Sequence, residues 1–344
     1  MSPSYPKTCK AVRIEEVGAP FQFVDVPVNE PEEGEILIKT EACGICHSDL
    51  FLQDGNWGDA ASFPRIPGHE VIGTVVAVGP REKKWKIGDR VGGGWHGGHD
   101  GVCVSCEKGL YQMCQNEGIN GINRDGGFAE YCTLRTEAAV RIPSDANSAD
   151  YAPLLCAGVT VFNGMRKQMV GTGGIVAIQG LGGLGHLALQ YSRRMGYRTV
   201  ALSTSASKKD FALEFGATDY IDTSKEDAAE ALQKMGGAAM IVVTAPNPKI
   251  MGPLADGLAP LGKLLILAPA GEFPVNAATL ILKGVSVTGW PAGHALDSEE
   301  TISFSQIQGV KCMIEKFPFE KALEAIQHTR DGRPRFRTVI VFEK

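Results

Sequence analysis

A short apolar segment followed by a glycine-rich turn constrains the fold of this chain more than any other feature. Residues 175–179 read as a β-strand, and residues 183–195 read as a helix. A glycine-rich hexapeptide alone is weak evidence, but one that follows a strand and opens a helix is typical of nucleotide binding. The alternative is a plain structural turn. The turn reads Gly180-Leu181-Gly182-Gly183-Leu184-Gly185.

Three glycines of this turn each have a physical reason. Gly180 allows a tight turn, Gly182 lets the backbone approach a pyrophosphate, and Gly185 permits close packing of helix on strand. The helix N-terminus offers unpaired N–H groups and a partial positive charge to the phosphates. We therefore predict that a dinucleotide cofactor binds here.

The rest of the chain shows two kinds of pattern. From residue 10 to about 141, short β-rich segments are separated by Gly and Pro turns, and residues 92–120 read as a long glycine-rich loop. From residue 151, an expected helix over 151–169 is followed by alternating strands and helices, which favours a parallel sheet covered on both faces. A chain of 344 residues normally exceeds one core. We expect an α/β protein with a β-rich domain at 1–156, a nucleotide domain at 157–291, and a segment at 292–344 that returns to the first domain.

Composition excludes several classes of function. A net charge of -5 gives no reason to expect binding to nucleic acid or to a membrane. We find no apolar run long enough to span a bilayer and no basic-then-apolar N-terminal signal. The nine cysteines of such a chain favour metal ligation in a reducing compartment over disulfides. The expected location is the cytoplasm.

Three separated segments supply a possible catalytic metal site. Cys46 stands beside His47 and Ser48, and His69 and Cys156 come from segments farther along the chain. Two cysteines and a histidine leave one coordination position of zinc open, which is the catalytic arrangement. Each ligand also has an ordinary reading, since a buried Cys is usually a small hydrophobe. Cys43 has CxxC spacing with Cys46, but we interpret it as a packed thiol outside the site.

A second cluster has the spacing of a closed structural zinc site. Its cysteines are Cys103, Cys106 and Cys114, and Asp100 occupies the position where a fourth thiolate would be expected. A carboxylate oxygen can bind zinc, but the neighbouring His99 is a rival ligand. A third possibility is that this lobe binds no metal.

These motifs, in this order and spacing, resemble those of the zinc-dependent alcohol dehydrogenases of the medium-chain dehydrogenase/reductase superfamily, from residue 10 to the end. The resemblance implies a GroES-like catalytic domain interrupted by a Rossmann domain. It implies hydride transfer between an alcohol and a nicotinamide cofactor, with one catalytic and one structural Zn²⁺ per chain. It also implies a homo-oligomer, either a dimer or a tetramer.

The resemblance assigns roles residue by residue. Cys46, His69 and Cys156 match the catalytic zinc ligands. Glu70 and Asp49 match carboxylates that orient the ligands, and we include Glu70 in the metal set as a further donor. Ser48 matches the hydroxyl that hydrogen-bonds the reacting alcohol and passes its proton outward. Cofactor contacts are matched by His47, Thr160 and Arg337, and substrate-pocket walls by Trp57 and Trp95.

Two residues depart from the family pattern. Phe51 stands where many members carry a relay histidine, so the proton path beyond Ser48 is open. Asp100 replaces a structural cysteine, which leaves the affinity of that site open. Two rival functions remain: a zinc-free quinone or enone reductase, and a non-enzymatic NADP-binding redox sensor. The first would leave Cys46, His69 and Cys156 without a purpose. Metal content and turnover separate both from the dehydrogenase.

The end of the second Rossmann strand predicts the cofactor. NAD-preferring relatives carry an acidic residue there to hold the ribose 2′-hydroxyl. Here the strand ends in Ser203-Thr204-Ser205, with Lys208 just beyond, so hydroxyls and a cation could hold a 2′-phosphate. We therefore predict NADP(H) in preference to NAD(H). The alternative is that these serines only cap the next helix.

Overall fold

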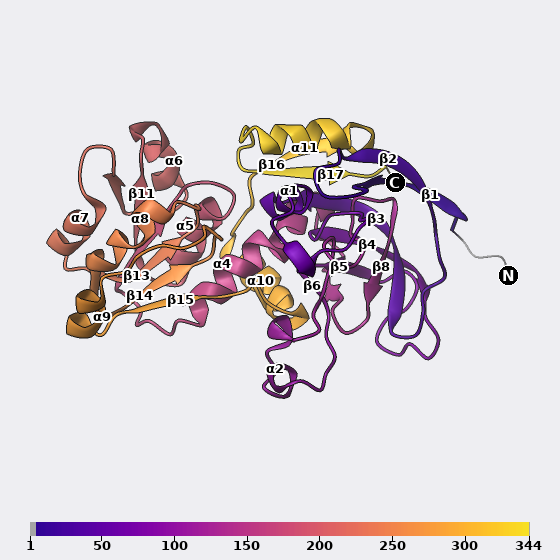
Figure 1. Ribbon diagram of the computed structural model, residues 1–344, viewed down its shortest axis with the longest axis horizontal. Coiled ribbons are helices and arrows are strands. Elements are labelled where there is room, and N and C mark those ends of the chain that lie inside the picture. Colours follow the sequence, from indigo (N-terminus) through magenta and orange to yellow (C-terminus); the bar gives the residue numbers. More distant parts are fainter. Residues whose placement is uncertain (1–4, 344) are drawn as a thin grey trace. The chain divides into compact units, whose positions relative to one another are not determined.

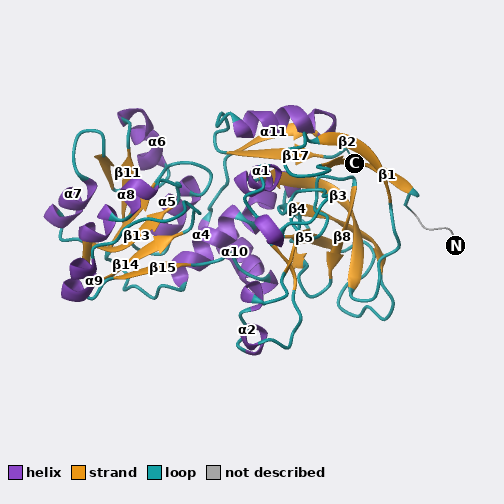
Figure 2. Ribbon diagram, in the orientation of Figure 1, coloured by secondary structure: helices purple, strands orange, loops and turns teal. Residues whose placement is uncertain are grey.

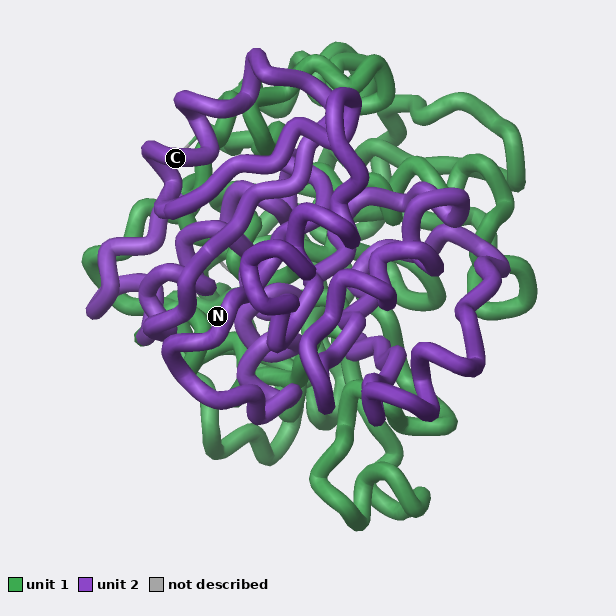
Figure 3. Tube along the Cα trace, turned by 90° about the vertical axis from the view of Figure 1, so that its left-hand side faces the viewer, with its two compact units in different colours: residues 1–156, 292–303, 312–344 green, residues 157–291, 304–311 purple. Residues whose placement is uncertain are grey.

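The computed structural model describes residues 5–343, and the chain divides into two compact units. Unit 1 comprises residues 1–156, 292–303 and 312–344, and unit 2 comprises residues 157–291 and 304–311 (Figure 3). The expected return to the first domain at residue 292 is therefore interrupted, because residues 304–311 group with unit 2. Residues 304–308 form the end of helix α10 (Ala295–Gln308), and residues 309–311 follow it.

Unit 1 is built around a seven-stranded sheet with the order β16-β17-β3-β4-β5-β9, in which β8 also pairs with β3 (Figure 1). The long β3 pairs antiparallel with β4, β8 and β17, so it ties the C-terminal strand to the N-terminal part of the chain. The strands are β1 (Thr8–Arg13), β2 (Gln22–Pro27), β3 (Glu35–Ile45), β4 (Val71–Val78), β5 (Arg90–Gly93), β6 (His96–Gly98), β7 (Gly118–Ile119), β8 (Tyr131–Arg135), β9 (Val140–Arg141), β16 (Ile314–Pro318) and β17 (Arg337–Val341).

Short helices complete unit 1. They are α1 (His47–Gln53), α2 (Val104–Glu107), α3 (Ser148–Tyr151) and α11 (Ala322–Arg330). Helix α11 buries Ala322, Ala325 and Ile326 in the same core as residues of β3, β4 and β8. The residues expected to form one long loop, 92–120, contain β6, α2 and β7. The pairing of β6 with β7 closes this segment into a lobe.

Unit 2 contains a six-stranded parallel sheet with the order β12-β11-β10-β13-β14-β15. If β10 is taken as the first strand of the unit, the order is 3-2-1-4-5-6, which is that of a doubly wound dinucleotide-binding fold. The predicted fold class is therefore confirmed. All five residues of β10 are buried, as expected for a strand covered on both faces. The strands are β10 (Ile175–Gln179), β11 (Arg198–Ser203), β12 (Asp219–Asp222), β13 (Ala238–Val243), β14 (Leu258–Ile266) and β15 (Ser286–Gly289).

Helices alternate with these strands along the chain (Figure 2). They are α4 (Ala157–Arg166), α5 (Gly185–Arg194), α6 (Lys209–Glu214), α7 (Ala228–Lys234), α8 (Pro248–Met251) and α9 (Ala277–Lys283). No helix within residues 5–343 is both long enough and apolar enough to cross a membrane.

The single helix expected over residues 151–169 is wrong. Helix α3 is followed by a 3₁₀ turn, η3 (Ala152–Leu155), and α4 begins only at Ala157. Cys156 separates them with φ -127° and ψ -74°, outside the helical region. Pro153, which cannot donate a backbone hydrogen bond, lies in the 3₁₀ turn. Because of this interruption, Cys156 lies outside regular secondary structure.

Candidate metal and cofactor sites

One buried carboxylate joins two of the segments that carry the predicted catalytic ligands. Cys46 is the N-cap residue of α1, and its N–H donates to Asp49 Oδ2 at 2.8 Å. The other oxygen, Asp49 Oδ1, accepts from the N–H of Gly68 at 3.1 Å and lies 3.2 Å from His69 Nδ1. Asp49 is fully buried. It therefore fixes both the start of α1 and the orientation of the His69 ring.

The structure brings all four predicted catalytic-site ligands together. Ligand atoms of Cys46, His69, Glu70 and Cys156 all lie within 4.8 Å of one another, and the two Sγ atoms are 4.0 Å apart. His69 is fully buried, and neither ring nitrogen has a partner with hydrogen-bond geometry: Nδ1 has only its 3.2 Å contact with Asp49, and Nε2 has none. Leaving such a group unsatisfied costs about 1–3 kcal/mol. Two thiols facing an unpartnered imidazole nitrogen form a donor set that suits zinc.

The pKa values of the two thiols shift in opposite directions. The contact with Cys156 holds the pKa of Cys46 well below its usual range, and the charge of Arg337 also acts to lower it. The same contact, together with burial, raises the pKa of Cys156. A metal binds the thiolate form of cysteine.

Glu70 is held by a buried ion pair. Arg337 Nη2 on β17 donates to Glu70 Oε1, and the two side chains are 6% and 0% exposed. Burial raises the pKa of Glu70 to about 7, although Arg337 acts to lower it. A Cβ at Gly44 would lie 1.9 Å from Glu70 Oε2, so only glycine fits there. The sequence predicted Arg337 as a cofactor contact but did not predict this contact with Glu70.

The expected substrate-side residues lie beside the metal cluster. The Trp95 ring meets the His69 ring edge-on at 5.1 Å, and Trp57 packs against Trp95 at 5.0 Å. The Trp57 indole N–H donates to the backbone carbonyl of Ser48 at 3.0 Å. Ser48 is half-buried. His47, which precedes Ser48, is exposed, and the centroid of its ring lies 6.2 Å from that of Phe51.

The second predicted cluster also comes together. Ligand atoms of Asp100, Cys103, Cys106 and Cys114 lie within 4.8 Å of one another. The Asp100 carboxylate accepts from the N–H groups of Val102 and Cys103 at 2.9 and 3.0 Å, and from Asn116 Nδ2 at 2.7 Å. A carboxylate offers about four lone-pair sites, so three such bonds leave room for one metal bond.

Cys114 receives backbone support of the kind that a thiolate needs. The N–H groups of Asp100 and Asn116 donate to Cys114 Sγ at 3.4 and 3.3 Å. The donor set of three thiols and one carboxylate fits a closed four-coordinate zinc site. The role of Asn116 could not be predicted, because an exposed amide carries no pattern in the sequence.

His99, the rival ligand, turns away from this cluster. Its ring stacks on Tyr111 at 4.2 Å, and its Nδ1 lies 3.1 Å from His96 Nε2. His96 Nδ1 in turn lies 2.9 Å from Glu117. Burial raises the pKa of Glu117 to about 8 and lowers that of His96 to about 4. Glu117, His96 and His99 therefore form a chain of contacts beside the second cluster.

The glycine-rich turn of unit 2 is tightly packed at two of its glycines and open at a third. A Cβ at Gly180 would lie 2.6 Å from Ala245 Cβ, and one at Gly185 would lie 2.0 Å from the carbonyl oxygen of Gly180. Gly182 has no atom within 4 Å of its Cβ position, so space remains for a ligand. Thr160, the other predicted contact in unit 2, is half-buried on α4.

The predicted 2′-phosphate residues follow the end of β11. Ser203 is buried, Thr204 is exposed, and Lys208 is half-buried. Ser205 Oγ accepts from the N–H of Ser207 at 3.2 Å, so this serine also caps the turn η4 (Ala206–Lys208). Asp222, which ends β12, lies opposite Ser203 in the sheet. Sequence alone gave no sign of Asp222, because strand register is a property of the fold.

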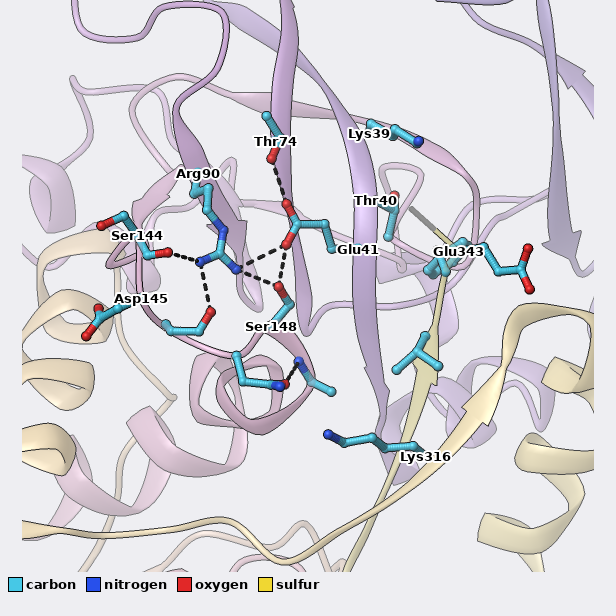
Figure 4. A pocket seen from close by; sticks show the side chains of 15 residues that line it. Lys39, Thr40, Glu41, Thr74, Arg90, Ser144, Asp145, Ser148, Lys316 and Glu343 are labelled. Carbon is cyan, nitrogen blue, oxygen red and sulfur yellow. Dashed lines mark hydrogen bonds and ion pairs between the residues drawn. The ribbon is translucent and has the colours of Figure 1, made fainter.

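A separate cavity of about 740 Å³ in unit 1 contains no residue of either metal cluster (Figure 4). The charged side chains at its centre, Arg90 and Glu41, form an ion pair and hydrogen bonds with the groups around them. Arg90 donates to Glu41 at 3.1 Å and to Ser148 Oγ at 2.6 Å, while Thr74 donates to Glu41 at 2.6 Å. Arg90 also donates to three backbone carbonyls in residues 143–146. This network anchors the segment that leads into α3.

Comparison with known proteins agrees with this geometry. Residues 32–144 match the model of the alcohol dehydrogenase GroES-like domain, and residues 183–306 match that of the zinc-binding dehydrogenases. The alcohol dehydrogenase patD of Penicillium expansum is 54% identical over 340 residues, covering 99% of both chains. The alcohol dehydrogenase of Geobacillus stearothermophilus is 34% identical over 333 residues, covering 96% of this chain and 98% of the relative.

Two solved structures share the fold. A cinnamyl alcohol dehydrogenase of Sorghum bicolor has a TM-score of 0.88 at 29% identity, with 97% of this chain and 98% of that chain covered. The CAD of Helicobacter pylori, complexed with NADP(H), has a TM-score of 0.84 at 26% identity, with the same coverage. Likeness over the whole length, in sequence as well as in fold, means that the chain belongs to the zinc-dependent alcohol dehydrogenases of the medium-chain superfamily, oxidoreductases that interconvert alcohols with aldehydes or ketones using a nicotinamide cofactor.

Proposed function

We propose that this enzyme is an NADP(H)-preferring alcohol dehydrogenase whose catalytic zinc is held by Cys46, His69 and Cys156. The observation that carries the proposal is the unpartnered His69 Nε2, buried beside two thiols 4.0 Å apart. Zinc in this position would polarise the oxygen of an alcohol or carbonyl and lower the pKa of the alcohol. Asp100, Cys103, Cys106 and Cys114 would hold a second, structural zinc.

The chain's own residues hold and move the proton. Ser48, beside the Trp57–Trp95 wall, accepts the proton of the alcohol during oxidation and returns it during reduction. Asp49 keeps the His69 ring in one orientation through its 3.2 Å contact with Nδ1. Glu70 lies with the ligands, and Arg337 balances its charge. Because Phe51 has no acid–base group, we propose that the proton passes from Ser48 directly to solvent.

The NADP(H) preference rests on the end of β11. Ser203, Thr204, Ser205 and Lys208 offer hydroxyls and a cation, and no carboxylate stands on that strand end. A hydrogen bond to a charged group contributes about 1.5–3 kcal/mol, or on the order of ten- to a hundredfold in affinity. The solved Helicobacter pylori relative, which is complexed with NADP(H), supports the same choice. In unit 2, Gly180 to Gly185 would contact the pyrophosphate.

The pocket wall suggests the substrate class. Two tryptophans, together with Ile14, Leu52, Ile122 and Phe63, form one apolar cluster beside His69. Such a wall favours planar, apolar alcohols and aldehydes, and one relative of known structure is named as a cinnamyl alcohol dehydrogenase. We propose that aromatic or unsaturated aldehydes are better substrates than short aliphatic ones.

We also propose that the enzyme is a cytoplasmic homo-oligomer. Strand β15 ends the sheet of unit 2, and large apolar side chains are exposed on this unit. Leu261 is 75% exposed, Ile281 78% and Leu282 84%. An unpaired sheet edge and an exposed apolar surface are typical of an interface. Sedimentation analysis of the protein and of an Ile281→Glu variant tests this, with a dimer or tetramer expected only for the first.

One experiment tests the central proposal. Zinc-quantified protein is assayed with NADPH and with NADH against cinnamaldehyde, benzaldehyde and acetaldehyde. We expect zinc-dependent turnover, a kcat/KM at least tenfold higher with NADPH, and a higher kcat/KM for the ring aldehydes. The Ser203→Asp variant should lose most of its NADPH activity and gain relative activity with NADH. Equal specificity constants for the two cofactors in the unmodified enzyme would rule out the preference.

A further inference from the structure

We propose that Tyr220 is a positioning residue that holds residues 203–208, the last residue of β11 and the loop after it, in the shape that binds the 2′-phosphate of NADP(H). The inference rests on the proposed NADP(H) preference. Tyr220 lies in β12, and its hydroxyl donates to the backbone carbonyl of Ser205. It therefore links a neighbouring strand to the loop whose side chains are expected to meet the phosphate.

Two hydrogen bonds join this segment to β12 and to the residue after it. The N–H of Thr223 donates to the carbonyl of Ser203 at 2.8 Å, and the Tyr220 hydroxyl donates to the carbonyl of Ser205. The other bonds of Ser205 remain within the loop: its hydroxyl contacts that of Ser207 and accepts from the N–H of Ser207, and its carbonyl accepts from the N–H of Lys208 at 3.4 Å. Those bonds shape the turn but do not fix it against the sheet. The Tyr220 bond supplies that attachment.

Thr204 lies between the two attachment points and is exposed. The two fixed carbonyls belong to the peptide groups 203–204 and 205–206, so the backbone between them, which carries Thr204, is restricted. Donors held in a binding-competent geometry lose less conformational entropy when the ligand arrives, so affinity rises. The fixed loop would therefore present Thr204 and Lys208 to the phosphate at little entropic cost.

The acidic residue Asp222 lies close to Tyr220, so the position of the loop affects the binding of a phosphate more than that of a neutral hydroxyl. Asp222 is two residues from Tyr220 in β12, so the two side chains lie on one face of the sheet. Its carboxylate accepts from the N–H and hydroxyl of Ser224 at 3.1 and 2.6 Å and lies 3.5 Å from Lys225 Nζ. The Ser224 bonds lower the pKa of Asp222, so it is ionised at neutral pH. A loosened loop would let the dianionic phosphate approach this charge.

The test uses Tyr220→Phe, which removes only the hydroxyl. The matched control is Tyr197→Phe, because Tyr197 also donates its hydroxyl to a backbone carbonyl in unit 2, that of Val170 at 3.1 Å, but precedes β11. Calorimetry gives the Kd of each protein for NADPH, NADH, 2′,5′-ADP and 5′-AMP. We expect Tyr220→Phe to raise the Kd for NADPH and for 2′,5′-ADP by about two- to tenfold, which corresponds to the loss of one hydrogen bond. The Kd of Tyr220→Phe for NADH and for 5′-AMP should stay within about twofold of the unmodified value. The control variant should keep all four Kd values within the same range.

The outcomes separate this inference from the proposed function. If the unmodified enzyme prefers NADPH and Tyr220→Phe keeps the full preference, Tyr220 does not position the loop, and the proposed function stands. A loss that is equal for NADPH and NADH, or that also occurs in Tyr197→Phe, shows general structural damage and overturns the inference. If the unmodified enzyme does not prefer NADPH, both the cofactor proposal and this inference fail.

Discussion

Replacing Arg337 by methionine should destabilise unit 1 strongly. The change removes the guanidinium and keeps most of the side-chain stem, so Glu70 stays fully buried without its cation. Removing one partner of a buried ion pair typically costs about 3–5 kcal/mol. For a unit of this size, each kcal/mol lowers the melting temperature by about 2–4 °C. We therefore expect a loss of roughly 6–20 °C.

The loss should depend on pH in a defined direction. Burial already raises the pKa of Glu70 to about 7, and Arg337 acts to lower it, so the variant's pKa is higher still. A carboxyl whose pKa is raised in the folded state loses stability as the pH rises. In the unmodified protein, stability stops falling near pH 7, where Glu70 becomes ionised in the folded state. In the variant, stability continues to fall above pH 7. The difference in melting temperature should therefore widen above about pH 7.

The assay is thermal unfolding of zinc-quantified protein at pH 6, 7 and 8, recorded by differential scanning calorimetry. The control is the double variant Arg337→Met with Glu70→Gln, which removes the ionisable group as well as the cation. We expect the double variant to recover much of the loss at pH 8. A single variant that melts within about 2 °C of the unmodified protein at pH 8 would refute the reasoning.

Three further substitutions address the separate sites. Cys46→Ser should abolish turnover while NADPH still binds, because the cofactor turn lies in unit 2; wild-type rates with full zinc content would contradict the ligand assignment. Cys106→Ser should lower the melting temperature and increase sensitivity to chelators before it affects chemistry, because a closed zinc site supplies folding free energy; an unchanged melting curve and zinc count would remove the structural site. Ser48→Ala should lower kcat by about a hundredfold, the lower end of the range for general acid–base groups, at unchanged zinc content, and full activity across pH would show another proton path.

Local patterns predicted the fold class and the family, and both are confirmed. The glycine turn could be interpreted because its context, a strand before and a helix after, is visible in ten or so neighbouring residues. The side chains predicted as metal ligands lie together in two groups in the structure, while their binding of zinc stays a prediction. Asp100 could be preferred over His99 on spacing alone, and in the structure the carboxylate faces the thiols.

What sequence could not supply depends on tertiary contacts. The break at Cys156 divides a segment whose apolar pattern favours one helix, because a 3₁₀ turn that contains Pro153 precedes it. The contact between Arg337 and Glu70 joins residues 267 positions apart, so no local pattern reveals it. Tyr220 and Asp222 gain their relation to Ser203 and Ser205 only from the pairing of β11 with β12. Strand β15 is too short and too exposed to be recognised by periodicity.

The most direct test of the central claim is a crystal structure with anomalous diffraction measured on both sides of the zinc absorption edge. The account predicts two zinc peaks per chain. One peak should lie about 2.3 Å from the Sγ atoms of Cys46 and Cys156 and about 2.0–2.1 Å from His69 Nε2. The other should lie among Asp100, Cys103, Cys106 and Cys114. No zinc peak beside His69 Nε2 in active, metal-replete enzyme would contradict the account.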